Sequence, residues 1–295
     1  MARRKRYTNY LSILFSIIII GVFIYSEISE SFKKEEYVPV STDLIVEFID
    51  VGQADSIYIT NNNHHMLIDG GNNKDGSLLV KYFKEKNIET FDYIVATHPH
   101  EDHIGGLDNI VKNFNIDNIY MIDLETDYKS YTDLIESINK KKIKVTYPNV
   151  DDTFTLGEAQ LRVIHIDNDK DNINDDSIVL KLIFGHNTFL FTGDITKQAE
   201  EKLLTSNLKS DILKIAHHGS PYSTSPAFIK KVDPKYAIIS VGENNEYNMP
   251  SDIILNRLKV MNIETHRTDK EGTIIVKSDG ENITITSNKT NTNRE

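Results

Sequence analysis

The chain has 295 residues, with 33 Lys and Arg against 44 Asp and Glu and a formal net charge of −11. It contains no Cys, which excludes disulfide scaffolds, zinc fingers, thiol nucleophiles and iron–sulfur clusters. The acidic balance disfavours tight nonspecific binding to nucleic acid, and the length allows one large domain or two small ones.

The N-terminal region predicts a single membrane anchor. A basic start over 1–6 precedes an uncharged apolar stretch over 7–26. A helix of about 20 residues crosses a hydrocarbon core of roughly 30 Å. Because positive charges favour the cytoplasmic side, we expect a single-pass protein of the cell membrane with a cytoplasmic N-terminus, a stalk over 27–43 and an extracellular body. The alternative is cleavage as a signal peptide, which would give a secreted protein.

The rest of the chain predicts a layered α/β body over 44–286, followed by a flexible tail over 287–295. Short apolar runs predict strands at 44–50, 56–60, 66–70, 91–97, 117–122, 161–166, 178–184, 188–192, 212–216, 273–276 and 283–286. Amphipathic stretches predict helices at 77–86, 105–114, 130–140, 196–204 and 251–261. Strand-then-helix order in both halves indicates two mixed sheets with helices outside.

A dense group of potential metal ligands follows the strand at 91–97, namely His98, His100, Asp102 and His103. His98 and His100 are two residues apart, so one extended turn can direct both at one ion while the other pair faces a neighbouring ion. Mixed nitrogen and oxygen ligands suit zinc, manganese or iron. The alternatives are a solvated histidine-rich loop and a purely structural metal site, although the supply of ligands exceeds what one structural ion needs.

Two further strand ends carry residues of the same kinds. Asp194 follows the strand at 188–192, and His217 and His218 follow the strand at 212–216. Each signal is weak alone, since such residues are common in turns. Because strand ends at one edge of an α/β sheet converge, the three segments together predict one site.

These motifs resemble those of a known group of proteins. HPHEDHIGG is similar to the HxHxDH signature of the metallo-β-lactamase fold superfamily. Seven motifs, in chain order, resemble the soluble domain of the ComEC competence family. They are FIDVGQADS (48–56), LIDGG (67–71), THPHEDHIGG (97–106), NDDSIVLKL (174–182), LFTGD (190–194), LKIAHHGS (213–220) and THRTDKEG (265–272). The resemblance implies a four-layer αββα sandwich with two divalent metal ions, zinc or manganese, between the sheets.

The resemblance also implies roles for individual residues. The expected ligands are His98 and His100 for the first ion, Asp102 and His103 for the second, Asp194 as a bridge, and His217 to complete the set. Asp69 would orient the histidine loop from behind, and Asp69 and Asp102 are the expected catalytic residues. Ser220 is an expected substrate contact, although an ordinary polar loop is an equally good interpretation of its segment.

One ligand of the superfamily is missing. Its usual further histidine, in the turn before the Gly-Asp strand, is replaced here by NDDS at 174–177. Asp175 is the preferred substitute and His165 the alternative. An oxygen-richer first site would shift the preference from zinc toward manganese. His218 is expected to contact substrate phosphate or to pack, with a ligand role less favoured.

These expectations together predict a membrane-anchored phosphodiesterase or nuclease. Two ions about 3.5–4 Å apart can hold a phosphodiester and lower the pKa of a water toward about 7, so that a metal-bridging hydroxide attacks phosphorus. The ComEC resemblance implies hydrolysis of DNA, with single-stranded DNA as a partner. The alternatives are an esterase acting on a cell-wall polymer such as phosphorylcholine or teichoic acid, a β-lactam or lactone hydrolase, and a non-catalytic metal-binding surface module.

Overall fold

The computed structural model describes residues 40–167 and 172–288. The expected start at 1–6 and anchor at 7–26 lie outside the described residues, as do most of the stalk and nearly all of the tail. Within the described part, no helix combines the length and the apolar character needed to cross a membrane.

The first sheet has eight strands in the order β15-β14-β1-β2-β3-β4-β5-β6. Pairing is antiparallel from β15 to β3 and parallel from β3 to β6. The strands are β1 (Leu44–Phe48), β2 (Ile57–Asn61), β3 (His64–Ile68), β4 (Thr90–Ala96), β5 (Asn115–Met121), β6 (Lys144–Thr146), β14 (Thr273–Ser278) and β15 (Ile283–Asn288).

The second sheet has seven strands in the order β13-β12-β11-β10-β9-β8-β7. Here pairing is parallel from β13 to β10 and antiparallel from β10 to β7. The strands are β7 (Thr153–Leu156), β8 (Ala159–His165), β9 (Val179–Phe184), β10 (Asn187–Phe191), β11 (Ile212–Lys214), β12 (Tyr236–Ile239) and β13 (Glu264–Arg267). The prediction of two mixed sheets is confirmed.

The main hydrophobic core lies between the two sheets. Phe48 of β1 and Phe191 of β10 meet there, with ring centroids 6.3 Å apart. Successive residues of a strand point to opposite faces. Leu190 therefore leaves this core and joins a second apolar cluster on the outer face of its own sheet. The central strands are buried on both faces, which explains their continuous apolar runs.

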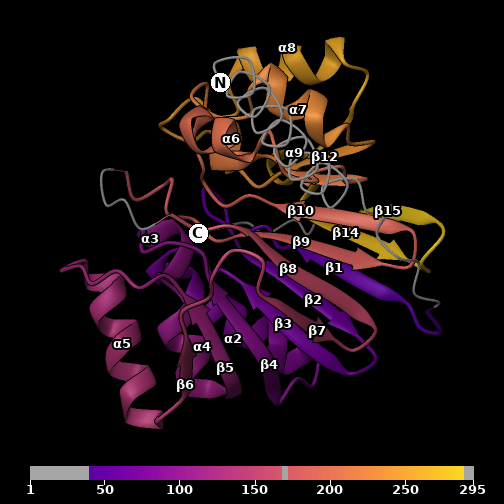
Figure 1. Cartoon of the computed structure of the whole chain (residues 1–295). Helices are drawn as coiled ribbons and strands as arrows, with labels where there is room; N and C mark the ends of the chain where they lie inside the picture. The colour runs from indigo at the N-terminus through magenta and orange to yellow at the C-terminus, as the bar shows by residue number, and fades with distance from the viewer. Residues whose placement is uncertain (1–39, 168–171, 289–295) are drawn as a thin grey trace, which may run out of the picture. The chain divides into compact units, whose positions relative to one another are not determined.

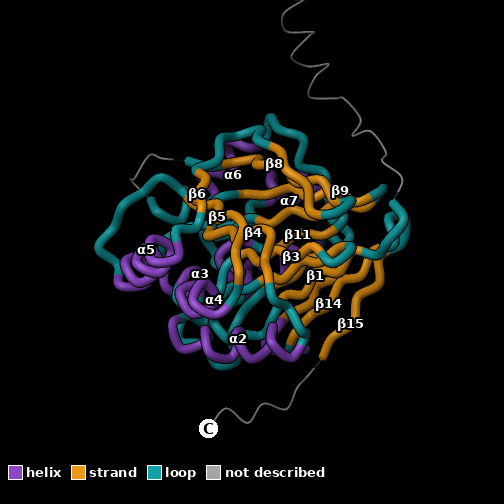
Figure 2. Tube along the Cα trace, turned by 90° about the horizontal axis from the view of Figure 1, so that it is seen from below, coloured by secondary structure: helices purple, strands orange, loops and turns teal. Residues whose placement is uncertain are grey.

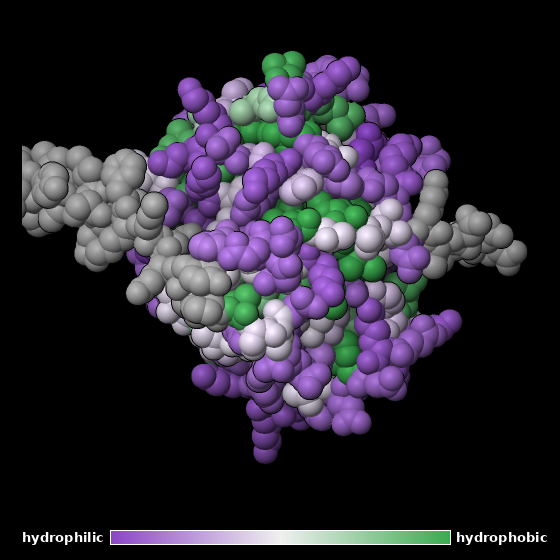
Figure 3. Space-filling model, turned by 90° about the vertical axis from the view of Figure 1, so that its right-hand side faces the viewer, coloured by the Kyte–Doolittle hydropathy of each residue, from purple (hydrophilic) through white to green (hydrophobic). Residues whose placement is uncertain are grey.

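Helices cover the two outer faces (Figures 1 and 2). The first sheet is covered by α2 (Gly76–Glu85), α4 (Leu107–Asn113) and α5 (Lys129–Lys141), and the second by α6 (Lys197–Leu203), α7 (Pro226–Val232) and α8 (Asp252–Val260). Each helix buries an apolar stripe at i, i+4 spacing, as Leu79 and Phe83 do in α2. The face on the side of β14 and β15 is mostly hydrophilic, with apolar side chains scattered among polar ones (Figure 3).

Candidate metal centre

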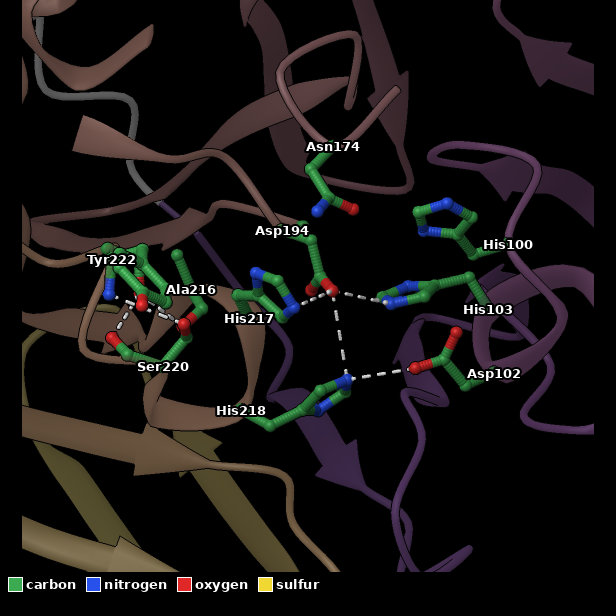
Figure 4. Close-up of polar contacts among 12 residues, drawn as sticks. His100, Asp102, His103, Asn174, Asp194, Ala216, His217, His218, Ser220 and Tyr222 are labelled. Carbon is green, nitrogen blue, oxygen red and sulfur yellow. Dashed lines mark hydrogen bonds and ion pairs between the residues drawn. The ribbon is translucent and has the colours of Figure 1, made fainter. Parts of the chain in front are cut away.

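Four loops bring ligand-type side chains together beyond the ends of the strands. Asp69 follows β3, residues 97–103 follow β4, Asp194 follows β10, and the pair 217–218 follows β11. β3 runs parallel to β4, and β10 runs parallel to β11, so within each sheet the two loops leave the same edge. Figure 4 shows side chains from both sheets pointing toward one another across this region. The convergence expected from the sequence is present.

The histidine loop contains a single turn of helix, α3 (Glu101–Ile104). His98 and His100 precede this turn, whereas Asp102 and His103 lie on it. Neighbouring loops fix the turn, because the amide of Asp55 donates to the carbonyl of Asp102 at 3.0 Å and the amide of Gly70 to that of His103 at 2.6 Å. These bonds satisfy carbonyl groups that a short helix leaves unpaired.

One group of four side chains, here called the second-ion group, has the spacing of a metal site. It consists of Asp102, His103, Asp194 and His218, each of which offers a ligand atom within 4.8 Å of the others. Asp194 Oδ2 lies 3.2 Å from His103 Nε2 and 3.8 Å from His218 Nε2. His218 Nε2 in turn lies 3.3 Å from Asp102 Oδ2. Two imidazole nitrogens and two carboxylates suit zinc or manganese.

His98 and His100 form an adjacent pair, here called the first-ion group. His98 Nε2 lies 3.1 Å from His100 Nδ1, and the ring of His98 is 4.0 Å from that of His103. Burial lowers the pKa of His98 well below its usual range and also lowers the pKa of His100. Both imidazoles are therefore neutral near pH 7, the form in which histidine binds a metal.

The charges in the second-ion group balance one another. Burial alone lowers the pKa of His103, but Asp194, Asp69 and Asp102 raise it well above its usual range. Burial alone raises the pKa of Asp194, but His103 and His218 hold it well below its usual range. Burial alone also raises the pKa of Asp102, but His103 and His218 lower it below its usual range. The carboxylates at the centre are therefore ionised near neutral pH.

Several buried atoms at the centre have no hydrogen-bond partner among the described residues. Asp194 Oδ1 and His103 Nε2 are two of them, and the contact of His103 Nε2 with Asp194 Oδ2 is an ion pair without hydrogen-bond geometry. Buried polar atoms are nearly always paired, so unpaired atoms need an explanation. Both atoms are of metal-ligand type and lie among other ligands. The residues present therefore fit the divalent ions implied by the sequence.

Asp69 lies behind the centre, as the sequence predicted. Its carboxylate accepts hydrogen bonds from the amide of Thr97 at 2.9 Å and from the Thr97 hydroxyl at 2.7 Å. Asp69 Oδ2 lies 2.8 Å from His103 Nδ1, which leaves His103 Nε2 directed at the second-ion group. This contact fixes the orientation of the imidazole.

A buried ion pair beneath His218 has no counterpart in the sequence predictions. Lys214 Nζ lies 2.8 Å from Asp55 Oδ2, and both side chains are at most 2% exposed. Asp55 Oδ1 lies 3.5 Å from His218 Nδ1, which is also 2.9 Å from the carbonyl oxygen of Ser240. Asp55 lies in the VGQADS motif and Lys214 in the LKIAHHGS motif. The motifs therefore contain both residues, but nothing in the sequence indicates that the two form an ion pair.

The His217-His218 turn has an unusual backbone conformation. Both residues have positive φ, at 50° and 53°. This left-handed region costs a residue other than glycine about 1–3 kcal/mol, and such strain is concentrated at functional sites. His217 Nε2 lies 3.8 Å from Asp194 Oδ2, and His217 is more exposed than His218. Both histidines are thus near the centre, and the choice between them as ligand stays a prediction.

The candidates for the missing ligand lie elsewhere. Asp175 accepts hydrogen bonds from the amide of Thr196 at 2.7 Å and from the Thr196 hydroxyl at 3.0 Å, just before α6. His165 Nε2 lies 2.8 Å from the carbonyl oxygen of Asp175.

Ser220, the expected substrate contact, is buried, and its hydroxyl accepts a hydrogen bond from the amide of Tyr222 at 3.3 Å (Figure 4). The ligand and substrate roles of these residues stay predictions.

Two mixed sheets covered by helices, with a histidine and aspartate cluster at their strand ends, define a class of layered α/β proteins that carry a metal site. The sequence model of the metallo-beta-lactamase superfamily matches residues 49–243, and the chain belongs to this superfamily. The crystal structure of the metallo-beta-lactamase fold protein YhfI from Bacillus subtilis is similar, with a TM-score of 0.55 at 14% identity over 81% of this chain and 100% of that one. CmlA, a diiron beta-hydroxylase from Streptomyces venezuelae, has a TM-score of 0.52 at 13% identity over 78% of this chain and 53% of CmlA. These likenesses show the fold alone.

Curated relatives confirm the distant homology to competence proteins. ComE operon protein 3 of Bacillus subtilis is 28% identical over 259 residues, which are 81% of this chain and 33% of that protein. Competence protein ComA of Neisseria gonorrhoeae is 37% identical over 111 residues, which are 36% of this chain and 16% of that protein. The chain therefore spans about a third or less of the length of these relatives.

Proposed function

We propose that the protein is a metal-dependent phosphodiesterase, and specifically a nuclease that hydrolyses DNA at the outer face of the cell membrane. The observation that carries the proposal is the position of Asp194. One of its carboxylate oxygens lies within 3.8 Å of the imidazoles of His103, His217 and His218, and the other is buried without a partner. The homology to competence proteins supports DNA as the substrate.

The proposed ligands follow from the two groups. His98 and His100 would hold the first ion, and Asp102, His103 and His218 the second, with Asp194 between them and His217 as the alternative to His218. Such ions supply Lewis-acid stabilisation of phosphoryl oxygens and lower the pKa of water. Asp69 holds His103 in its binding orientation through the 2.8 Å contact. The buried Ser220 and the exposed Tyr222 would contact the substrate where the site opens.

The predicted anchor explains where the enzyme would act. Residues 7–26 would hold the protein in the membrane with residues 44–286 outside the cell, where DNA or wall polymers are accessible. With cleavage of the anchor, the same domain would be secreted.

The test is a substrate panel with the purified full-length chain in detergent. We expect bis-p-nitrophenyl phosphate and single-stranded DNA to be hydrolysed with Mn²⁺ or Zn²⁺. Asp194→Asn should lower the rate by on the order of 100-fold or more, because a central ligand loses its charge. Asp133→Asn on the surface of α5 is the control and should retain the rate. Failure to cleave any phosphodiester with either ion would overturn the proposal.

A wall-polymer esterase is the second candidate, and one observation favours it. Tyr128 is stacked on His100 with ring centroids 6.1 Å apart, and aromatic rings bind quaternary ammonium groups. This enzyme would release phosphorylcholine from a wall ester and leave DNA intact. A metal-binding module without turnover would bind ions and cleave nothing in the panel.

A further inference from the structure

The first-ion group has fewer protein ligands than the second. His98 and His100 supply two imidazoles, and Asp194 is shared with the neighbouring group. The carboxylate of Asp175 is engaged by Thr196, and His165 contacts a backbone carbonyl instead of the centre. A further protein donor beside His98 and His100, if the site has one, is therefore to be sought among residues other than Asp175 and His165.

Asn174 has a side chain in the required place. In Figure 4 its amide group points into the centre, between Asp194 and His100. Its Oδ1 atom is buried and has no hydrogen-bond partner. A buried amide oxygen is normally paired, so an unpaired one that points toward this group of ligand-type side chains is suited to accept a cation.

The loop that carries Asn174 is fixed to both halves of the centre through Ser177. The Ser177 hydroxyl donates to the carbonyl of Asn174 at 2.7 Å and accepts from the amide of Asp194 at 3.1 Å. The same hydroxyl lies 3.3 Å from His98 Nδ1, the ring nitrogen that faces away from His100. Ser177 thus sets the position of Asn174 relative to His98 and Asp194 together.

Gly193 makes this arrangement possible. It has a φ of +51°, and a Cβ atom there would lie 2.7 Å from Ser177 Cβ. Any other residue would therefore push the Ser177 loop away from the strand end.

We propose that Asn174 Oδ1 is a protein ligand of the first ion, in the position where the superfamily usually has a histidine. This inference rests on the proposed two-metal function. A neutral amide oxygen is a harder and weaker ligand than imidazole, so the first site favours Mn²⁺ relative to Zn²⁺ and exchanges its ion more readily than the second.

Metal binding tests the inference without any measurement of activity. The metal-free full-length chain is titrated with Mn²⁺ and with Zn²⁺ by calorimetry and by competition with a chelator. We expect two ions per wild-type chain, one of them weaker. Asn174→Ala should lower the affinity for the more weakly bound ion by about 10-fold or more. Asn174→His should raise the affinity for Zn²⁺ at the same site by a similar factor. Asn113→Ala on α4 is the matched control and should bind both ions as the wild type does.

Each outcome decides the inference. Unchanged affinity for both ions in Asn174→Ala would overturn it, as would a wild-type chain that binds fewer than two ions. If Asn174→Ala does not fold, Asn174→His still decides: tighter Zn²⁺ binding at the weaker site with two ions per chain supports the inference, and unchanged binding or a third ion overturns it. A wild-type chain that binds two ions but cleaves no phosphodiester would refute the proposed function. The metal titrations of the Asn174 variants would still decide whether Asn174 is a ligand.

Discussion

At the scale of single residues, the centre depends on groups that hold the ligands as much as on the ligands themselves. Asp69 accepts three contacts from Thr97 and His103, and all three residues are buried. A histidine whose outer nitrogen bonds a carboxylate has a fixed tautomer and ring orientation. Asp69 is therefore a positioning residue for the second-ion group.

Replacing Asp69 tests this role. Asp69→Asn keeps the shape of the side chain but removes its charge, so His103 loses a charged acceptor for Nδ1–H. We expect the affinity of the second-ion group for Zn²⁺ to fall by about 10–100-fold, measured by chelator competition. Asp108→Asn, whose carboxylate contacts Lys112 and Asn109 on α4, should leave the affinity unchanged. An Asp69→Asn chain with wild-type affinity would rule out the positioning role.

The Lys214–Asp55 pair gives a prediction about stability. Lys214→Met leaves the Asp55 carboxylate buried without its partner, which should cost about 3–5 kcal/mol of unfolding free energy. Urea unfolding of the metal-free chain measures this cost without a contribution from bound ions. Lys214→Met combined with Asp55→Asn should recover most of the loss, because neither charge of this pair remains buried without the other. If the single and double variants are equally unstable, packing around Lys214 is responsible rather than charge.

The sequence identified the ligand-type residues better than it identified their surroundings. His98, Asp102 and Asp194 were expected at one centre, and the structure gathers them because the loops after β4 of the first sheet and β10 of the second meet. Asp55 and Lys214 were not expected as partners, since they are far apart in the chain and no local pattern encodes a contact between distant loops. Asn174 was overlooked because its amide belongs to no usual list of metal ligands, although it begins the NDDS segment.

At the scale of elements, α6 and the loop after the His217-His218 turn are joined by one buried carboxylate. Glu200 of α6 accepts hydrogen bonds from the amides of Thr224 and Ser225, the latter at 2.8 Å. Ser225 is also the N-cap of α7, where its hydroxyl accepts from the amide of Phe228. Glu200 thus holds the segment that contains Ser220 and Tyr222 against the second sheet.

Glu200 should make the stability depend on pH. Burial raises the pKa of Glu200 in the folded protein. A group with a raised folded-state pKa contributes stability that is fully present below its unfolded pKa and is lost as the pH rises through the folded value. The difference in unfolding free energy between the wild type and Glu200→Gln should therefore increase in favour of the wild type as the pH falls from 7 toward about 4.5.

The measurement is urea unfolding of both chains across that pH range. Glu201→Gln, on the exposed side of the same helix, controls for the loss of one charge. Comparing variants with the wild type cancels the titration of the metal centre, which all three chains share. If the difference in unfolding free energy between the wild type and Glu200→Gln stays constant or decreases as the pH falls, the pKa of Glu200 is not raised in the folded protein.

Elements with strong periodic patterns were predicted well, and short ones were not. The helix expected at 251–261 is α8, and that expected at 130–140 is α5, each within about one residue. β7 and β13 were missed because they are short and partly polar. α7 (Pro226–Val232) was not predicted, although Ser225-Pro226 is a typical helix start.

At the scale of the whole molecule, the metal centre joins the two sheets. His98, Asp102 and His103 follow a strand of the first sheet, whereas Asp194 and His218 follow strands of the second. An ion bound by both sets would connect the halves in the folded state only. The sequence predicted the two mixed sheets correctly because strand runs occur in both halves, but the antiparallel and parallel pairings depend on long-range packing that periodicity does not encode.

Metal removal should therefore lower thermal stability. A ligand that binds only the folded state stabilises it by about 2.7 kcal/mol at 100 times its Kd, and each kcal/mol raises the Tm by about 2–4 °C in a domain of this size. We expect saturating Mn²⁺ or Zn²⁺ to raise the Tm by several degrees over the EDTA-treated chain, measured by scanning calorimetry. Asp194→Asn should show a much smaller rise. Equal midpoints with and without metal in the wild type would mean that no ion connects the sheets.

The most direct measurement is anomalous diffraction from crystals of the protein grown with Mn²⁺. The account predicts two adjacent peaks, about 3.5–4 Å apart, as two-metal hydrolases show. One peak should lie among Asp102, His103, Asp194 and His218, and the other beside His98 and His100. No peak at these residues, or a lone ion bound elsewhere on the surface, would contradict the account.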